Sequence, residues 1–501
     1  MIKVHLKNNW FLFISIGLAG LCYSQAMRSP YWSLVSLIGY GYFLRTKMQP
    51  IPNQKYYDLF FTTVWLLGSH YWLIHPMVSV MQVPMIISIP CLLLSCLLLA
   101  PLFNIPLWLC DTLGTYRLFP LFSLLFDILR QHTPLALPWT NLGLIWLNLP
   151  LGPTLLAICG RFICAYLILT VITTVTSRQS HKTGWFRLIY TLITAVSVAL
   201  ILHKRGNHTP SRSSDTTPMS IIQGNLSAHE KLNPWITWNV YKTLLDKHQS
   251  PNTIHIIPEG MLTTNTDHYQ DDLKQSSSLP NSIIGSTLFD QHQIEATQAA
   301  LGFGNIKGHY YKQILVPFGE SVPFHSLLTN LPYIGKHIPE PSAKWTNSSP
   351  YLTDGKHYFS PIICYELFFN HTIDTHLTDA WVVLAENTWY ENTLMQTHFL
   401  NMARLKAIET GRPVVLAMNK GPSAFISEQG KIVNQSQYGQ KTILSHPLKI
   451  NKASGLGILH STIAQLLFIL GIELAYGCCL MGYRWLKQAP NQTLKHVSML
   501  K

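Results

Sequence analysis

The chain has 501 residues, of which 48% are hydrophobic and only 12% are charged, and its formal net charge is +13. Soluble domains carry about 25% charged residues, so this composition excludes a protein that is soluble along its whole length. The positive charge is spread over loops and the C-terminal tail, which favours membrane topology and anionic lipid as its cause. We therefore expect no nucleic-acid partner.

Apolar blocks occupy the first 202 residues, and one more lies near the C-terminus. A bilayer span takes about 20 mostly apolar residues. The candidate spans are Trp10–Gln25, Tyr31–Phe43, Tyr57–Ile74, Met85–Phe103, Leu118–Leu129, Leu155–Val175, Arg187–Leu202 and Leu456–Leu480. The sequence therefore predicts a polytopic α-helical membrane domain of about eight spans.

Basic residues predict how these spans are oriented. With eight spans, the loops at 45–55 and 178–187 and the basic C-terminal tail fall on one side, which the positive-inside rule makes cytoplasmic. The predicted domains are 1–203, a membrane domain of about seven helices; 204–453, an extracytoplasmic domain; and 454–501, a C-terminal transmembrane helix with a basic cytoplasmic tail. We expect a bacterial cytoplasmic (inner) membrane protein with its large polar domain on the outer, periplasmic face.

Short β-rich runs alternate with amphipathic stretches in the polar domain. The predicted strands lie within 219–224, 253–260, 282–286, 299–304, 358–366, 381–387 and 412–419. A helix is predicted over 397–412, with Gly411 as its C-terminal stop, and a hairpin over 424–433. This alternation is typical of an α/β domain with a sheet core.

Polar residues follow several of these strands, and strand ends that share one edge of a sheet are where α/β folds build sites. They are Glu259, Cys364, Glu366, Glu386, Asn387 and Asn419. Of the nine cysteines, only Cys364 lies in the polar domain, so it has no disulfide partner there. Because no Cys/His ligand spacing is present, we expect neither a metal nor another cofactor.

A cysteine nucleophile needs a base to take its proton and a cation or N–H donors to hold the oxyanion that forms. His371 and His376 lie a few residues downstream of Cys364, and spacing alone leaves them open as bases. A carboxylate acting with a lysine is the alternative. Lys312 lies in "HYYKQILVPFGESVPF", which also holds the acid Glu320.

These segments resemble the nitrilase superfamily, whose catalytic set is Glu, Lys and Cys. Together with the apolar blocks they resemble the apolipoprotein N-acyltransferase family over nearly the whole chain. The similarity rests on "IQGN" at 222–225, "IPEG" at 257–260, "YYKQILVPFGESVP" at 310–323, "IICYE" at 362–366 and "MARLKAIETGRPVVLAMNKGPSAFISEQG" at 402–430. The resemblance implies an α/β nitrilase-like αββα sandwich for the polar domain.

The resemblance also implies roles for individual residues. Glu259 would be the general base, Lys312 the oxyanion stabiliser and Cys364 the nucleophile. Glu320 and Glu366 would be supporting acids that hold Lys312. The remaining supporting residues would be Tyr365, beside the nucleophile, and Asn387.

The family reaction is a ping-pong transfer through a thioester. Cys364 would take a fatty acyl chain from a phospholipid, and the N-terminal amine of a diacylglyceryl-cysteine apolipoprotein would then attack the thioester to form an amide. The implied partners are the phospholipid donor, the lipoprotein acceptor and the lipid bilayer. The residues expected to admit the acyl chain are Trp389, Tyr390, Leu394 and Met395.

Several motifs depart from the family pattern. "IIPEG" stands for a Trp-Pro-Glu-Ser motif, "AENTW" for Ser-Asn-Asp before Trp, and "NKG" at 419–421 for Asn-Asn-Gly. The changes leave the implied Glu, Lys and Cys in place but alter the surrounding loops. Two alternatives therefore stay open: another membrane-anchored nitrilase-like enzyme, acylating a different (pilin-like) N-terminus or hydrolysing an amide, and an inactive membrane scaffold.

Overall fold

The structure, a computed structural model, describes most of the chain. The described residues are 2–131, 133, 138–177, 185, 189–193, 215–248, 250, 252–265, 279–289, 296–330, 342, 349–369, 377–450, 462–478 and 481. The predicted domain boundaries near 203 and 453 and most of the predicted span Arg187–Leu202 lie outside them.

The N-terminal part, residues 2–177, is helical and is called the helical half below. Its elements are α1 (Ile2–Ser24), α2 (Pro30–Lys47), α3 (Gln54–His70), η1 (Tyr71–Leu73), α4 (Ile74–Ser79), α5 (Met85–Phe103), α6 (Ile105–Leu113), α7 (Phe119–Gln131), η2 (Pro138–Thr140), η3 (Leu142–Asn148) and α8 (Gly152–Thr176). The first six predicted spans therefore all coincide with helices.

Two helical stretches in the described residues are long and apolar enough to cross a membrane, Met85–Leu113 and Gly152–Thr176. Trp10–Ser24 and Thr462–Cys478 are apolar but shorter. The number of eight spans thus stays a prediction. Large apolar side chains are nevertheless exposed on the helical half, for example Phe11 at 76% and Ile86 at 81%.

Residues 215–450, called the sheet domain below, form two six-stranded sheets. The first has the order β12-β1-β2-β3-β4-β5 and the second β11-β10-β9-β8-β7-β6. The strands are β1 (Asp215–Gln223), β2 (Ile254–Asn265), β3 (Ser282–Phe289), β4 (Ala296–Phe303), β5 (His309–Tyr311), β6 (Leu352–Thr353), β7 (Tyr358–Ile363), β8 (Ala380–Ala385), β9 (Val414–Met418), β10 (Ala424–Ile426), β11 (Ile432–Gln435) and β12 (Thr442–Ile450). All seven predicted strands and the hairpin at 424–433 are confirmed.

The two sheets pack face to face, because β2 contacts β8 and β9 and β4 contacts β7. Parallel pairing of β1 with β2 and β2 with β3, and of β7 with β8 and β8 with β9, buries these strands on both sides and explains their continuous apolar runs. The helices in the described part of the sheet domain are α10 (Ala228–Lys231), α11 (Pro234–Lys247), α13 (His325–Leu328) and α14 (Leu394–Thr410). Short 3₁₀ turns follow two strands, η6 (Cys364–Phe368) after β7 and η7 (Thr388–Tyr390) after β8.

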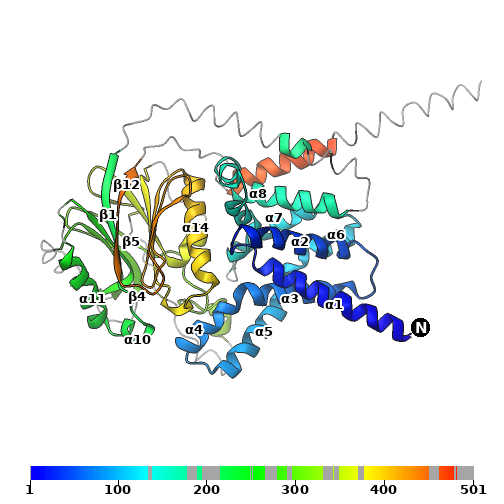
Figure 1. Cartoon of the computed structure of the whole chain (residues 1–501), viewed down its shortest axis with the longest axis horizontal. Coiled ribbons are helices and arrows are strands. Elements are labelled where there is room, and N and C mark those ends of the chain that lie inside the picture. The colour runs from blue at the N-terminus through cyan, green and yellow to red at the C-terminus, as the bar shows by residue number, and fades with distance from the viewer. Residues whose placement is uncertain are drawn as a thin grey trace, which may run out of the picture.

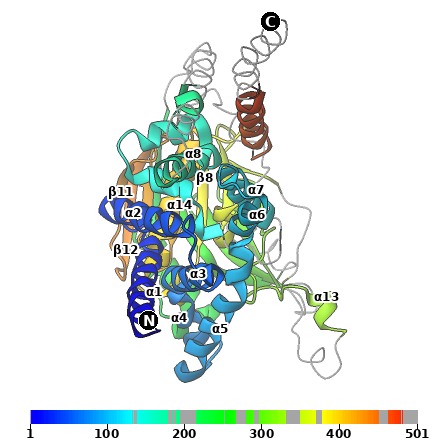
Figure 2. The same cartoon turned by 90° about the vertical axis from the view of Figure 1, so that its right-hand side faces the viewer.

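Helix α14 lies between the second sheet and the helical half, whereas α11 covers the opposite face of the sheet domain (Figure 1). Because it is covered on both sides, α14 is buried almost all round, and it ends where Gly411 adopts a left-handed φ of 61°. The layers are thus helix, sheet, sheet, helix, as the αββα expectation requires. Seen from the right-hand side of Figure 1, the helical half lies in front of the strands and α13 projects away from them (Figure 2).

Candidate active site

Cys364 is the first residue of η6, directly after β7, and its φ of 51° is left-handed. Glu366, two residues later, accepts a hydrogen bond from the backbone N–H of Ile363 at 2.8 Å. Its other oxygen accepts the N–H groups of Gln313 and Ile314 at 2.6 and 3.1 Å. Burial raises the pKa of Glu366 to about 7. This carboxyl group therefore joins the turn at Cys364 to the segment that follows β5.

Lys312 lies directly after β5, between two carboxylates. Its Nζ donates to Glu259 Oε1 at 2.9 Å and to Glu320 Oε1 at 2.7 Å. Burial alone would lower the pKa of Lys312, but the charges of Glu259 and Glu320 raise it well above its ordinary value. The lysine thus keeps a positive charge in a buried site. Of the two predicted supporting acids, Glu320 contacts this ammonium, whereas Glu366 binds the backbone beyond it.

The thiol of Cys364 meets the other end of this group. It donates to the carbonyl oxygen of Glu386, 3.8 Å from Sγ, and the negative charge of the Glu259 carboxylate acts on it. Burial, followed by the charge of Glu259, raises the pKa of Cys364 well above its usual range. The resting group is therefore a thiol, which needs a base before it can attack. The structure brings together Lys312 and Cys364, which follow the ends of β5 and β7, and Glu259, which was predicted at a strand end but lies inside β2, where the pairing with β3 is irregular.

Two further charged residues border this site. Lys231, at the end of α10, lies with its Nζ 2.8 Å from Glu386 Oε2, and the backbone N–H of Glu386 donates to Glu259 Oε2 at 3.0 Å. Sequence reasoning noted Glu386 only as a strand-end acid and missed Lys231. The sequence signal that could have predicted the helix carrying Lys231 is the Ser-x-x-Glu capping box of Ser227 and Glu230, which is formed at the start of α10.

Asn387 supports a loop rather than the reacting groups. Its Nδ2 donates to Gln396 Oε1 at 2.6 Å and to the carbonyl of Gly421 at 2.7 Å, and its Oδ1 accepts from the backbone N–H of Lys420 at 3.0 Å. Tyr365 points toward the helical half, with its ring 5.8 Å from that of Trp139.

The predicted acyl-chain residues lie where the sheet domain meets the helical half. The ring of Tyr390 is 5.2 Å from that of Trp72 in an edge-on arrangement, and burial raises the pKa of Tyr390. Leu394 and Met395 are buried, and Trp389 is half-buried. The structure therefore places Tyr390 within electrostatic reach of Cys364 and against Trp72 of the helical half.

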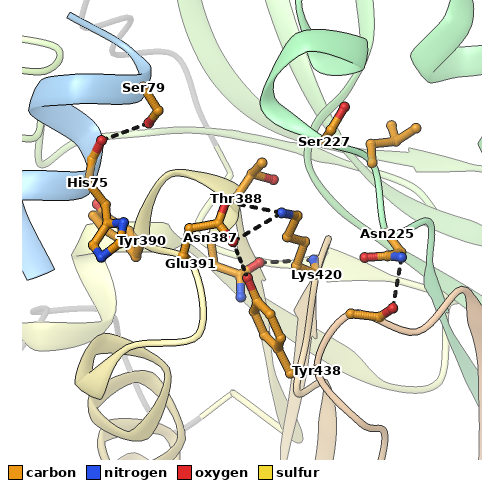
Figure 3. A network of polar contacts seen from close by, with 12 residues as sticks. His75, Ser79, Asn225, Ser227, Asn387, Thr388, Tyr390, Glu391, Lys420 and Tyr438 are labelled. Atoms are coloured by element: carbon orange, nitrogen blue, oxygen red, sulfur yellow. Dashed lines mark hydrogen bonds and ion pairs between the residues drawn. The ribbon is translucent and has the colours of Figure 1, made fainter. Parts of the chain in front are cut away.

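An exposed polar network borders the same loop (Figure 3). The carboxylate of Glu391 lies 3.3 Å from Lys420 Nζ and accepts a hydrogen bond from the hydroxyl of Tyr438 at 3.2 Å. The backbone of Glu391 has φ 47° and ψ −163°, a region that normally needs glycine. These contacts hold an unfavourable backbone conformation next to Tyr390.

The histidines left open as bases, His371 and His376, lie outside the described residues. Within the part of the chain that the structure describes, no group of three or more His, Cys, Asp or Glu side chains is arranged to hold a metal ion.

Two family models match different parts of the chain. The carbon-nitrogen hydrolase family matches residues 283–455, and the apolipoprotein N-acyltransferase N-terminal domain matches residues 19–174. Together they cover more than half of the chain. The first match includes Lys312 and Cys364, whereas Glu259 lies before it.

Several curated relatives are named Apolipoprotein N-acyltransferase. The protein from Haemophilus influenzae is 28% identical over 256 residues, which are 47% of this chain and 49% of the relative. The Pasteurella multocida protein is 30% identical over 264 residues, which are 46% of this chain and 48% of the relative. The Vibrio parahaemolyticus protein is 25% identical over 346 residues, which are 65% of this chain and 67% of the relative. The first two alignments thus span about half the length of the relatives.

Among solved structures, Saccharomyces cerevisiae Nit3, a member of branch 10 of the nitrilase superfamily, is 15% identical with a TM-score of 0.34, covering 47% of this chain and 90% of that chain. One family model matches the N-terminal helices and another matches the strands that carry Lys312 and Cys364. The chain therefore belongs to the apolipoprotein N-acyltransferase family within the nitrilase superfamily.

Proposed function

We propose that this protein transfers a fatty acyl chain from a phospholipid, through a thioester on Cys364, to the N-terminal amine of a diacylglyceryl-cysteine apolipoprotein. The observation that carries the proposal is a buried set in which Lys312 is hydrogen-bonded to Glu259 and the charges of both act on Cys364. It lies in a chain whose helical half exposes apolar side chains. The names of the relatives support the same reaction.

In the first half-reaction Glu259 takes the proton of Cys364 as the sulfur attacks the ester carbonyl carbon of the phospholipid. The negative charge that develops on the carbonyl oxygen is stabilised by the ammonium of Lys312. The C–O bond then breaks, and the leaving alkoxide takes the proton back from Glu259 as lysophospholipid departs. The acyl chain remains on Sγ as a thioester.

In the second half-reaction the acceptor amine attacks the thioester carbonyl and gives its proton to Glu259. Collapse of the intermediate breaks the C–S bond, forms the amide and returns the proton to Cys364. A thioester is readily cleaved by an amine, which suits a thiol better than a hydroxyl as the carrier. Glu320 holds Lys312 in place during both steps.

The proposed placement is a bacterial cytoplasmic membrane, with residues 1–203 and 454–501 in or beside the bilayer and residues 204–453 on the outer face. Both substrates are lipids or lipid-linked, so they would approach along the bilayer. Exposed apolar side chains in such numbers normally mark a membrane or protein contact. The junction lined by Tyr390, Leu394 and Met395 is where the acyl chain would enter.

The test is a transfer assay with the purified full chain in detergent micelles that contain phosphatidylethanolamine. We expect a diacylated lipopeptide to become triacylated by mass spectrometry. Without acceptor, Cys364 should gain one acyl mass while lysophospholipid is released. Cys364→Ala should do neither.

Complementation of a strain depleted of its own N-acyltransferase is the matching test in cells. Failure of well-expressed, membrane-inserted wild-type chain would overturn the proposed acceptor. Acylation of Cys364 with transfer only to a peptide lacking the diacylglyceryl group would identify a different amine as the substrate.

A further inference from the structure

The ammonium of Lys231 is held by three acceptors at the edge of the proposed site. Its Nζ lies 2.8 Å from Glu386 Oε2, 2.9 Å from the carbonyl oxygen of Glu259 and 3.1 Å from that of Gly260. The two carbonyl contacts are hydrogen bonds donated by the ammonium, and the contact with Glu386 is an ion pair. Lys231 and Glu386 are both more than nine-tenths buried at the side chain, so the pair is shielded from solvent screening.

Each of these contacts lies one step from a reacting group. Glu259 and Gly260 form an irregular turn in β2, where the pairing register with β3 shifts and Gly260 has φ 66°. The main chain of Glu386 donates its N–H to Glu259 Oε2 and directs its carbonyl toward Cys364 Sγ. Lys231 therefore links two residues that belong to different sheets. One is Glu259, through its backbone carbonyl, and the other is Glu386, whose main chain contacts both Glu259 and Cys364.

The side chain of Glu386 is held on its other oxygen as well. Its Oε1 accepts from the backbone N–H of Thr388 at 2.8 Å and from the Thr388 hydroxyl. The hydroxyl in turn accepts from Asn419 Nδ2 at 2.7 Å. The orientation of Glu386 is therefore set from both sides.

Charge balance gives this pair a second effect. Among the described residues, Glu259, Lys312, Glu320 and Tyr390 interact electrostatically with Cys364, and Lys231 and Tyr241 interact with Glu386. Lys312 is shared by two carboxylates, so Lys231 is the cation that neutralises Glu386. Without Lys231, the charge of Glu386 would disfavour a thiolate on Cys364.

We propose that Lys231 and Glu386 are positioning residues for the reaction: their ion pair orients the base Glu259 and screens the nucleophile Cys364 from the charge of Glu386. The inference rests on the proposed catalytic roles of Glu259 and Cys364. It adds a second lysine–glutamate pair to the Lys312 pair, and it explains how "AENTW" accommodates an acid where the family pattern has an amide.

The experiment titrates Cys364 in the full-length protein in detergent, following iodoacetamide modification of the Cys364 peptide by mass spectrometry across pH. Lys231→Met should move the midpoint upward by about one pH unit, since it leaves Glu386 unneutralised. Glu386→Gln should move it downward, because Lys231 is then the unbalanced charge. The double variant Lys231→Met/Glu386→Gln should return it close to wild type.

Acyl-transfer rates provide the second readout. Lys231→Met should lower kcat by at least about tenfold, because the base is misplaced, with a smaller change in KM. Lys231→Arg, which keeps the charge, should recover part of the rate. The matched control is Lys242→Met, an exposed lysine on the neighbouring helix α11, which should leave midpoint and rate unchanged.

The inference would be overturned if the Cys364 midpoint moved in the same direction in both single variants. It would also be overturned if neither single variant moved the midpoint while both melted like wild type. The titration requires neither acyl donor nor acceptor. If the wild-type protein fails to acylate lipopeptide while Lys231→Met and Glu386→Gln shift the Cys364 midpoint in opposite directions, the proposed function is refuted and the role of the ion pair is supported.

Discussion

At Cys364 the backbone takes a left-handed φ of 51°, which costs a non-glycine residue about 1–3 kcal/mol. The hydrogen bonds of Glu366 to Ile363, Gln313 and Ile314 offset this cost by over-determining the turn. Such a turn at a strand end directs the side chain to one side of the backbone, as a nucleophile requires.

The carboxylate of Glu259 is the proposed base, and its charge raises the pKa of Cys364. For Glu259→Gln we therefore expect two opposite effects. The pH curve for alkylation of Cys364 should move to lower pH, because a neutral amide no longer opposes the thiolate. Acyl transfer should fall by at least about 100-fold, because the base is gone.

Both effects are measured on one preparation, by peptide mapping after iodoacetamide and by the triacylation assay. The Cys364→Ala variant reports background alkylation of the other cysteines. If alkylation and transfer decline together, Glu259 acts only on folding.

At the scale of elements, the segment after η7 contains a glutamate in a glycine-like conformation. Glu391, at φ 47° and ψ −163°, is held by Lys420 and Tyr438. An exposed ion pair contributes about 0–1 kcal/mol, whereas the backbone conformation costs about 1–3 kcal/mol. The free-energy cost of the Glu391 backbone conformation therefore exceeds the stabilisation that its side-chain contacts contribute.

We expect Glu391→Gly to raise the melting temperature slightly, with a gain of about 1 kcal/mol, because glycine adopts this conformation freely. Glu391→Ala and Lys420→Met should lower it by up to about 1 kcal/mol, since both lose the ion pair and keep the strain. Thermal unfolding in detergent measures all three. A Glu391→Gly protein that melts below Glu391→Ala would contradict the strain assignment.

At the scale of the whole molecule, the helical half is held to the sheet domain at a break in α8, where residues after the break bind side chains of other segments. Gly160 leaves helical geometry with φ 74° and ψ 168°, so the next residues begin a new helical segment with unpaired N–H groups. Glu409 of α14 accepts the backbone N–H of Arg161 at 3.0 Å and binds its guanidinium at 2.6–3.1 Å. The side chain of Gln465 accepts the N–H of Phe162 at 2.9 Å.

Arg161→Met leaves a buried carboxylate without its cation, and we expect it to cost about 3–5 kcal/mol. Arg161→Met/Glu409→Gln should recover more than half of this, because the amide oxygen still accepts the backbone N–H of residue 161 without a buried charge. Thermal unfolding of the full chain in detergent measures the difference. Equal stabilities for the single and double variants would show that the charge pair is not what joins the two parts.

The sequence alone was sufficient for the strands, for helix α14 with its glycine stop, and for the motifs around Glu259, Lys312 and Cys364. Strand and helix periodicity and turn chemistry act over a few residues, so they can be read locally. The number of membrane spans could not be settled in this way, because apolar runs such as Leu118–Leu129 are too short to separate a span from a core helix.

Only the tertiary structure decided which polar groups meet. Lys231 and Glu386, or Arg161 and Glu409, are separated by more than 100 residues and have no local pattern that pairs them. Their contacts arise because two sheets pack face to face and α14 packs on the helical half, which brings charged ends of distant segments into one buried space. A charge in such a buried space needs a partner. The packing of the sheets and helices therefore determines which ion pairs form, and the linear sequence does not.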